Sequence, residues 1–325
     1  MLADHGGDLG RARAVFGGSP ADWIDLSTGI NRVPYPIPDI PADCWHALPD
    51  KPLFDAITAA ARAAYGTDAD CLPLSGAQAA IQLIPRAFNA GHVAILSPTY
   101  NEHASCFRAA GWKVTEVADR AALPDADACV IVNPNNPDGR ITPTDRLIEL
   151  SKRFRLLIVD ESFADATPHC SIAAQVGQPG TIILRSFGKF YGLAGMRLGF
   201  ALGHTSDLDR LRQRAGPWAV NGPALHIGIN ALRDQTWQHN TRLRLQIDAD
   251  RLDAMALTTG FAVVGGCPLF RLYHVADATT VHTTLAKAHI WSRIFPGNQN
   301  WVRLGLPGSD VEWDRLDVAL SACSD

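Results

Sequence analysis

Short apolar runs alternate with stretches of helical periodicity over the first two thirds of the chain. The runs are brief, rich in β-branched residues and apolar on both faces, as strands of a sheet covered by helices must be. They occupy residues 93–97, 129–133, 156–160, 181–186 and 198–203. Helical stretches between or before them cover residues 77–88, 103–110 and 144–154. This alternation predicts an α/β layer with a mostly parallel central sheet.

The pattern changes after about residue 225. Residues 226–257 predict one long helix with Arg, Gln and Asp on one face. Strand-like runs at 261–264, 269–273, 289–295 and 301–306, with a helix at 279–288, then predict a smaller α+β domain. Clustered prolines at 34–41 oppose both helix and central strand and predict an extended segment. We therefore expect an N-terminal arm over residues 1–40, a large domain over 41–225, and a small C-terminal domain over 226–325 that packs with the arm.

Composition narrows the class of protein. A formal net charge of -4 argues against nucleic acid or an anionic membrane as the main partner. No apolar stretch reaches the length of a membrane span, and the first 18 residues do not resemble a signal peptide. The seven cysteines are scattered without a CxxC pair, which predicts reduced thiols in a cytoplasmic protein rather than disulfides. The eleven histidines show no metal-binding spacing, so we expect no metal.

Three polar segments follow predicted strands, where ligands of open α/β sheets bind. They are NPNNPDG at 133–139, DES at 160–162, and RSFGKFYGLAGMRLGF at 185–200. Each has an ordinary interpretation by itself: a turn, a helix cap and a solvated loop. Lysine is rare in this chain, however, and Lys189 lies in a Ser/Gly-rich loop with Arg197 eight residues later. A lysine, an acid and phosphate-binding cations are what a pyridoxal cofactor needs.

The order of these segments resembles that of fold-type I pyridoxal-phosphate (PLP) enzymes, which share the aspartate-aminotransferase fold. The resemblance covers essentially the whole chain. It implies that Lys189 holds PLP as a Schiff base and that Asp160 pairs with the ring nitrogen, so that both are catalytic. Asn136 is expected to bind the phenolic oxygen, and Tyr100 to stack on the ring. Many relatives have a tyrosine where this chain has Phe163, and this departure puts ordinary transamination in doubt.

The same resemblance implies a phosphate site for the cofactor. Ser186 and Arg197 are expected to bind the phosphate, and Gly76 and Ala77 to add backbone N–H groups at the start of a helix. Tyr65 is expected to reach the phosphate of a neighbouring subunit. The protein is therefore expected to be a homodimer with shared active sites.

Four further segments resemble the threonine-phosphate decarboxylases of cobalamin biosynthesis, which are related to histidinol-phosphate aminotransferases. They are HGGD at 5–8, DLSTGIN at 25–31, DESF at 160–163 and PWAVN at 217–221. All but DESF lie outside the shared cofactor core and so carry information on the subfamily. Two departures are Arg32, where proline is usual, and the loop SGAQ at 75–78 in place of the GNGETE of some relatives.

The substrate implied by this resemblance is L-threonine O-3-phosphate, with (R)-1-amino-2-propanol O-2-phosphate as the product. Its carboxylate and phosphate call for cations, and arginine suits both groups through its planar fork. The substrate-binding set implied by the resemblance is His5, Asn31, Asn221, Arg293 and Arg303. If these residues bind the distal phosphate of the substrate, its carboxylate is free to lie out of the plane of the cofactor ring, as decarboxylation requires.

Two alternatives remain open on the sequence. The first is a histidinol-phosphate-type aminotransferase that uses 2-oxoglutarate, because the same cofactor core serves both reactions. Phe163 and the HGGD and PWAVN segments favour decarboxylation over it. The second is a non-catalytic PLP-binding regulatory protein. Such regulators usually carry an added DNA-binding domain, and no segment of this chain indicates one.

Overall fold

Contacts within the chain divide the computed structural model, which describes residues 5–323, into two compact units. Unit 1 comprises Met1–Pro34, Pro137–Gly139 and Asn240–Asp325, and unit 2 comprises Tyr35–Asn136 and Arg140–His239. The chain therefore crosses between the units several times, and a short part of the NPNNPDG segment belongs to unit 1. The domain boundaries at residues 40 and 225 stay predictions.

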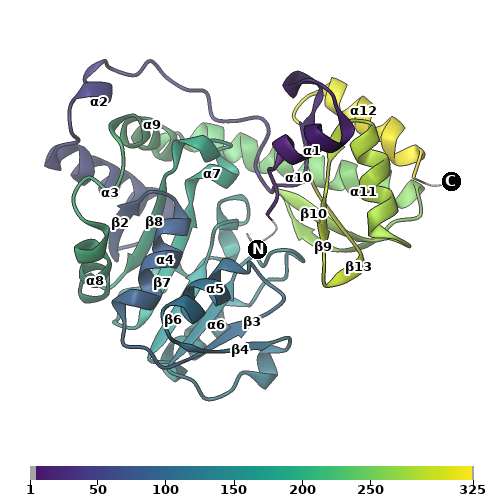
Figure 1. Cartoon of the computed structure of the whole chain (residues 1–325). Helices are drawn as coiled ribbons and strands as arrows, with labels where there is room; N and C mark the ends of the chain where they lie inside the picture. The colour runs from purple at the N-terminus through teal and green to yellow at the C-terminus, as the bar shows by residue number, and fades with distance from the viewer. Residues whose placement is uncertain (1–4, 324–325) are drawn as a thin grey trace. The chain divides into compact units, whose positions relative to one another are not determined.

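Unit 2 is built on a sheet of seven strands in the order β2-β8-β7-β6-β5-β3-β4 (Figure 1). Strand β8 runs antiparallel to both of its neighbours, and the pairs among β7, β6, β5, β3 and β4 are parallel. The prediction of a mostly parallel sheet is confirmed, and the five predicted strands lie within one residue of their expected bounds. The strands are β2 Asp70–Leu74, β3 His92–Leu96, β4 Lys113–Val117, β5 Ala128–Val132, β6 Leu156–Asp160, β7 Thr181–Ser186 and β8 Gly199–Gly203.

The register of this sheet brings the predicted segments to one edge. Val132, the last residue of β5, pairs with Asp160, the last residue of β6. Asp160 in turn pairs with Leu184, two residues before the end of β7. Every residue of β5 and β6 is buried, which explains their uniformly apolar sequences. The loops after β5, β6 and β7 therefore leave the sheet side by side.

The helices of unit 2 include those predicted at 77–88, 103–110 and 144–154, each shifted by no more than one residue. Residues 34–41 form neither helix nor strand, as the clustered prolines predict. No described helix of the chain is long and apolar enough to cross a membrane. The helices lying wholly in unit 2 are α2 Asp43–His46, α3 Lys51–Tyr65, α4 Ala77–Ala87, α5 Glu102–Ala109, α6 Thr144–Arg153, α7 Phe187–Phe190, α8 Thr205–Ala215 and α9 Gly222–Arg233.

The prediction of one long helix over residues 226–257 is wrong. The structure has two helices there, α9 and α10 (Gln235–Thr258), separated at Asp234. The Asp234 carboxylate accepts a hydrogen bond from the Trp237 backbone N–H (2.9 Å), so it starts a new helix instead of continuing the old one. Helix α9 also begins earlier than predicted, because the Asn221 side chain caps it by accepting from the Ala224 N–H (2.8 Å).

Unit 1 contains a four-stranded antiparallel sheet in the order β12-β13-β10-β9 and a short parallel pair, β1 with β11. Helix α1 packs against α11, and α11 packs against β13 and α12 (Figure 1). The strands and helix predicted after residue 260 are confirmed, with residues 289–295 divided into two short strands. The elements are α1 Leu9–Phe16, β1 Ile24–Asp25, the larger part of α10, β9 Ala262–Cys267, β10 Phe270–His274, α11 Ala278–Lys287, β11 Ile290–Trp291, β12 Arg293–Phe295, β13 Asn298–Gly305 and α12 Asp310–Ser321.

Candidate active site

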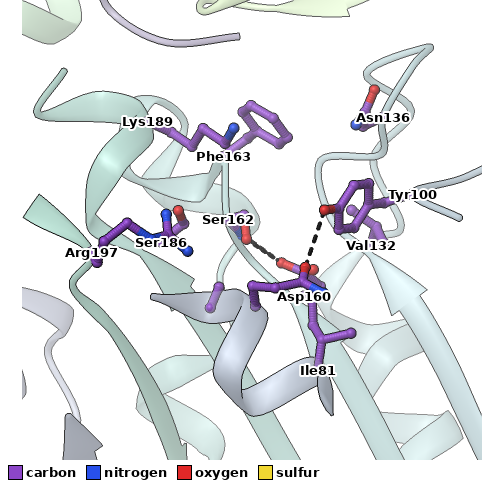
Figure 2. Close-up of a pocket in the computed structure, with 12 residues that line it drawn as sticks. Ile81, Tyr100, Val132, Asn136, Asp160, Ser162, Phe163, Ser186, Lys189 and Arg197 are labelled. Carbon is purple, nitrogen blue, oxygen red and sulfur yellow. Dashed lines mark hydrogen bonds between the residues drawn. The ribbon is translucent and has the colours of Figure 1, made fainter. Parts of the chain in front are cut away.

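A cavity of about 230 Å³ lies in unit 2 where the loops after β5, β6 and β7 meet the start of α4 (Figure 2). Lys189, Ser186 and Arg197 lie on one side of it, Tyr100 and Asn136 on the other, and Asp160 and Ser162 lie between them. The residues of the predicted cofactor set that line the cavity are Ala77, Tyr100, Asn136, Asp160, Ser186, Lys189 and Arg197. Residues from five separate stretches of sequence thus converge on one space.

Asp160 is buried at the end of β6 and is held by two neighbours. His103 Nε2 lies 2.8 Å from Asp160 Oδ2, and the Ser162 backbone N–H donates to Oδ1 (3.0 Å). The Ser162 hydroxyl donates to the same Oδ1 (2.5 Å). Burial alone would raise the pKa of Asp160, but the hydrogen bond and charge of His103, with the hydrogen bonds from Ser162, outweigh it and hold the pKa below its usual value. The site therefore contains a carboxylate that stays ionised in a buried place.

Lys189 lies on the short helix α7, directly after strand β7. Its Nζ atom lies 5.7 Å from the centroid of the Phe163 ring, over its face. Ser186, the last residue of β7, precedes this helix and lines the same cavity. Arg197 has a left-handed backbone (φ 56°) that ends the turn Ala194–Met196 and turns the chain into β8. The Lys189 amine, the Ser186 hydroxyl and the Arg197 guanidinium thus lie at the same cavity.

The start of α4 forms a glycine-lined cradle beside these groups. Gly76 has φ +82°, and a Cβ there would lie 2.8 Å from Arg197 Nη2. A Cβ on Gly199 would lie 2.3 Å from the backbone nitrogen of Ala77. Glycine at both positions therefore lets the guanidinium and the helix start approach closely. Helix N-termini bind phosphate, so the cradle fits the phosphate of a cofactor held by Lys189.

Tyr100 is tethered by Gln78, the last residue of the loop SGAQ. The Tyr100 hydroxyl donates to Gln78 Oε1 (3.1 Å), and Gln78 Nε2 donates to Glu102 Oε2 (3.3 Å). Burial, with the nearby negative charges of Glu102 and Asp160, raises the pKa of Tyr100 to about 12. The phenol is therefore a neutral donor, and the amide of Gln78 sets the direction of its hydrogen bond.

Tyr65, which was expected to reach the phosphate of a neighbouring subunit, lies in the core of unit 2 in this chain. Its side chain is buried inside unit 2, 9% exposed, and its ring packs edge-on against Phe200. The Arg185 guanidinium lies 4.3 Å from the Tyr65 ring centroid. Tyr65 ends helix α3, whose inner face holds it in the core. A contact of Tyr65 with a neighbouring subunit stays a prediction.

Arg185 belongs to a buried ionic network next to the ends of β6 and β7. Its guanidinium donates to Glu161 (2.8 Å) and pairs with Asp165, and all three side chains are almost fully buried. Glu161 also accepts from the Ser171 hydroxyl (2.5 Å). Because Glu161 follows Asp160 and Arg185 precedes Ser186, the network ties together the ends of β6 and β7. It holds two strands that carry site residues.

Two of the predicted substrate residues, His5 and Arg293, line a second cavity, which lies in unit 1. Arg303 is buried in the same unit, pairs across strands with Arg293, and donates to the Ser27 carbonyl oxygen (2.7 Å). Burial and the charge of Arg293 lower the pKa of Arg303 to about 10. Two arginines so close together favour a bound anion.

The two predicted asparagines have local structural roles. Asn31 is buried in unit 1, and its Oδ1 accepts from Arg244 Nη2 (2.7 Å) and from the Val33 backbone N–H (3.1 Å). Asn221 caps α9 in unit 2 and does not line the cavity there. Substrate contacts by these two residues stay predictions.

Sequence reasoning missed two residues that shape the first cavity, His103 and Gln78. Both had a signal. His103 lies one helical turn after Tyr100, and Gln78 stands in the first turn of the helix predicted from residue 77.

Among residues 5–323, no group of three or more His, Cys, Asp or Glu side chains is arranged to hold a metal ion.

Comparison with known proteins agrees with this geometry. The model of the family "Aminotransferase class I and II" matches residues 46–320, and the chain belongs to this family. The chain is 43% identical to the threonine-phosphate decarboxylase of Pseudomonas aeruginosa, over 98% of this chain and 97% of that protein.

Two solved structures share the fold at low sequence identity. The L-threonine-O-3-phosphate decarboxylase of Porphyromonas gingivalis has a TM-score of 0.76 at 20% identity, covering 91% of this chain and 98% of that one. The histidinol-phosphate aminotransferase of Sinorhizobium meliloti, in complex with pyridoxal-5'-phosphate, has a TM-score of 0.79 at 19% identity, covering 97% and 94%. The predicted aspartate-aminotransferase-like fold is thereby confirmed.

Proposed function

We propose that this protein is a PLP-dependent threonine-phosphate decarboxylase. The observation that carries the proposal is that Lys189, on α7 directly after β7, and Asp160, at the end of β6, line one cavity with a phosphate cradle. The 43% identity to the Pseudomonas aeruginosa enzyme over nearly the whole chain supports the same reaction. The product, (R)-1-amino-2-propanol O-2-phosphate, would serve cobalamin biosynthesis.

The residues of unit 2 would hold the cofactor. When bound, PLP supplies the electron sink that accepts the electron pair left when carbon dioxide departs. Lys189 Nζ binds the cofactor and is the amine that moves a proton. Asp160, kept ionised by His103, holds a proton on the ring nitrogen, and Asn136 orients the phenolic oxygen. Ser186, Arg197 and the backbone of Gly76 and Ala77 bind the phosphate.

The residues of unit 1 would recognise the substrate. Arg293, Arg303 and His5 are cations or hydrogen-bond donors suited to a phosphate or a carboxylate. Phe163 presents a ring without a hydroxyl to Lys189, so it cannot donate a hydrogen bond. This feature supports decarboxylation over the histidinol-phosphate aminotransferase alternative.

A product assay tests the proposal. The purified holoenzyme is given L-threonine O-phosphate without a keto acid, and carbon dioxide and aminopropanol phosphate are measured. We expect both in equal amounts. If no carbon dioxide forms, and amino transfer appears once histidinol phosphate and 2-oxoglutarate are supplied, the protein is an aminotransferase instead.

We also propose that the protein is a cytoplasmic homodimer. Three exposed apolar side chains lie on one segment of unit 2, where a second copy would cover them: Ile37 (62% exposed), Trp45 (67%) and Leu48 (66%). All seven cysteines are free thiols, which fits a reducing compartment. Sedimentation of the wild type and of Trp45→Glu tests the dimer, and equal masses would contradict this interface.

A further inference from the structure

Two segments that identify the subfamily meet at Ser27 in unit 1. The Gly7 backbone N–H donates to Ser27 Oγ (2.7 Å), and Gly7 has φ +89°. A Cβ on Gly6 would lie 2.5 Å from the Ser27 carbonyl oxygen, so only glycine fits there. The Ser27 hydroxyl donates to Asp25 Oδ1 (2.6 Å), which fixes its direction. The close approach of the two segments brings His5 to a cavity.

This cavity has a volume of about 310 Å³ and a cationic lining. Arg11 and Arg293 line it together with His5 and His282, and Asp8 is the one carboxylate residue among the lining residues. The Asp8 Oδ1 atom accepts from the Arg11 backbone N–H (2.9 Å) as the cap of α1. Within residues 5–323, the Arg11 guanidinium has no hydrogen-bond or ion-pair partner. The balance of charge favours an anion.

His282 is held in a fixed orientation at the wall of this cavity. Its Nδ1 atom lies 2.7 Å from the hydroxyl of Ser292, which is buried. Its ring packs on Trp291 at 4.3 Å between centroids. A side chain positioned by two neighbours loses little entropy when it binds a ligand, so His282 is suited to a directed contact.

We propose that Arg11 and His282 are further residues of the substrate's phosphate site in unit 1, where they determine specificity for the phosphate monoester together with His5 and Arg293. The inference rests on the proposed function and adds two residues that the resemblance did not indicate. A phosphate monoester carries close to two negative charges near neutral pH, and arginine matches its oxygens in pairs. The apolar wall of Phe16, Trp291 and Ile294 suits the methyl group next to the phosphate of phosphothreonine.

Calorimetric titration of the holoenzyme tests the site directly. The probes are inorganic phosphate, O-phospho-L-threonine and L-threonine, and bound PLP keeps the probes out of the cofactor phosphate site. Arg11→Ala should weaken binding of the first two probes by about tenfold, the loss expected for a charge-assisted hydrogen bond, and leave L-threonine unchanged. Arg13→Ala is the matched control, because Arg13 lies on the same helix outside the cavity.

Steady-state kinetics on the same variants separates specificity from catalysis. Arg11→Ala and His282→Ala should raise KM for O-phospho-L-threonine about tenfold and leave kcat within about twofold. Arg11→Lys should recover part of the affinity because it restores the charge. Unchanged KM in Arg11→Ala, with wild-type phosphate affinity, would overturn the inference.

The outcomes also separate this inference from the proposed function. If phosphate binding depends on Arg11 but no carbon dioxide is released, the phosphate site is supported and the proposed decarboxylase function is rejected. If carbon dioxide is released and substitution of Arg11 or His282 has no effect, the decarboxylase function is supported and the proposed phosphate site is rejected. Inorganic phosphate that binds through Arg11 without competing against O-phospho-L-threonine would mark a site for free phosphate and would also reject the inference.

Discussion

His103 Nε2 lies 2.8 Å from Asp160 Oδ2, and both side chains are buried. A carboxylate only accepts hydrogen bonds, so His103 carries its proton on Nε2 and donates it to Asp160. This contact counteracts the effect of burial, which by itself raises the pKa of Asp160. His103 is therefore a positioning residue that keeps Asp160 charged.

His103→Phe should raise the pKa of Asp160, because desolvation then acts with less opposition. A lowered pKa in the folded protein means that the wild-type carboxylate stays ionised until the pH falls through that pKa. In the variant, the acid limb of the pH profile of kcat/KM should move to higher pH, and kcat/KM near neutrality should fall about tenfold. His92→Ala is the control, since His92 contacts Thr115 instead (2.8 Å). An unmoved acid limb would argue against the role.

Lys189→Ala should abolish turnover and covalent attachment of the cofactor. Borohydride reduction followed by mass spectrometry should find PLP on the wild type and none on the variant. Lys152→Ala, on helix α6 outside the cavity, should retain both properties. Full activity of Lys189→Ala would reject the assigned role of this residue.

Gln78→Leu should weaken PLP binding by about two- to tenfold, because loss of a net hydrogen bond costs about 0.5–1.5 kcal/mol. The physical reason is the lost tether on the Tyr100 hydroxyl. Tyr100→Phe should have a similar effect through this contact, and the double variant should lose less than the sum of the two. Titration of apoprotein with PLP, followed by fluorescence, measures the affinity. Gln82→Leu, one turn along the exposed face of α4, is the control.

Arg185→Met should lower the free energy of unfolding by about 3–5 kcal/mol, because it leaves the buried Glu161 and Asp165 without their cation. Adding Glu161→Gln should recover part of the loss. Urea unfolding at constant cofactor saturation measures the difference. Arg155→Met, which removes an exposed ion pair with Asp127, should cost less than about 1 kcal/mol. Equal losses in the two arginine variants would contradict a structural role for the network.

Gly139→Ala should destabilise unit 1 by more than about 2 kcal/mol, as steric strain in a packed place does. Gly139 has φ +68°, and a Cβ there would lie 1.9 Å from the Gly266 carbonyl oxygen. Gly177→Ala is a control in open space, and its thermal unfolding should match the wild type. If the two variants unfold alike, this close approach does not constrain the NPNNPDG segment.

The sequence by itself determined the strands, the order of the site segments and the cofactor class. These depend on local properties: short apolar runs form buried strands, and polar residues directly after them must lie at the carboxyl edge of the sheet. Lys189, Asp160, Asn136 and Arg197 could be placed in one site for that reason. The same local reasoning failed at residues 226–257, because helical periodicity continues through Asp234 and only its capping contact separates α9 from α10.

The tertiary structure decided which distant side chains meet. His103 and Asp160 are 57 positions apart, Gln78 and Tyr100 are 22 apart, and each pair forms only because neighbouring elements pack together. The Tyr65 ring packs against Phe200 and the Arg185 guanidinium, and no local pattern indicates these contacts. Arg11 and His282 reach one cavity because α1 packs on α11. Contacts of this kind depend on the packing of whole elements, and a linear pattern of apolar and polar residues does not encode them one by one.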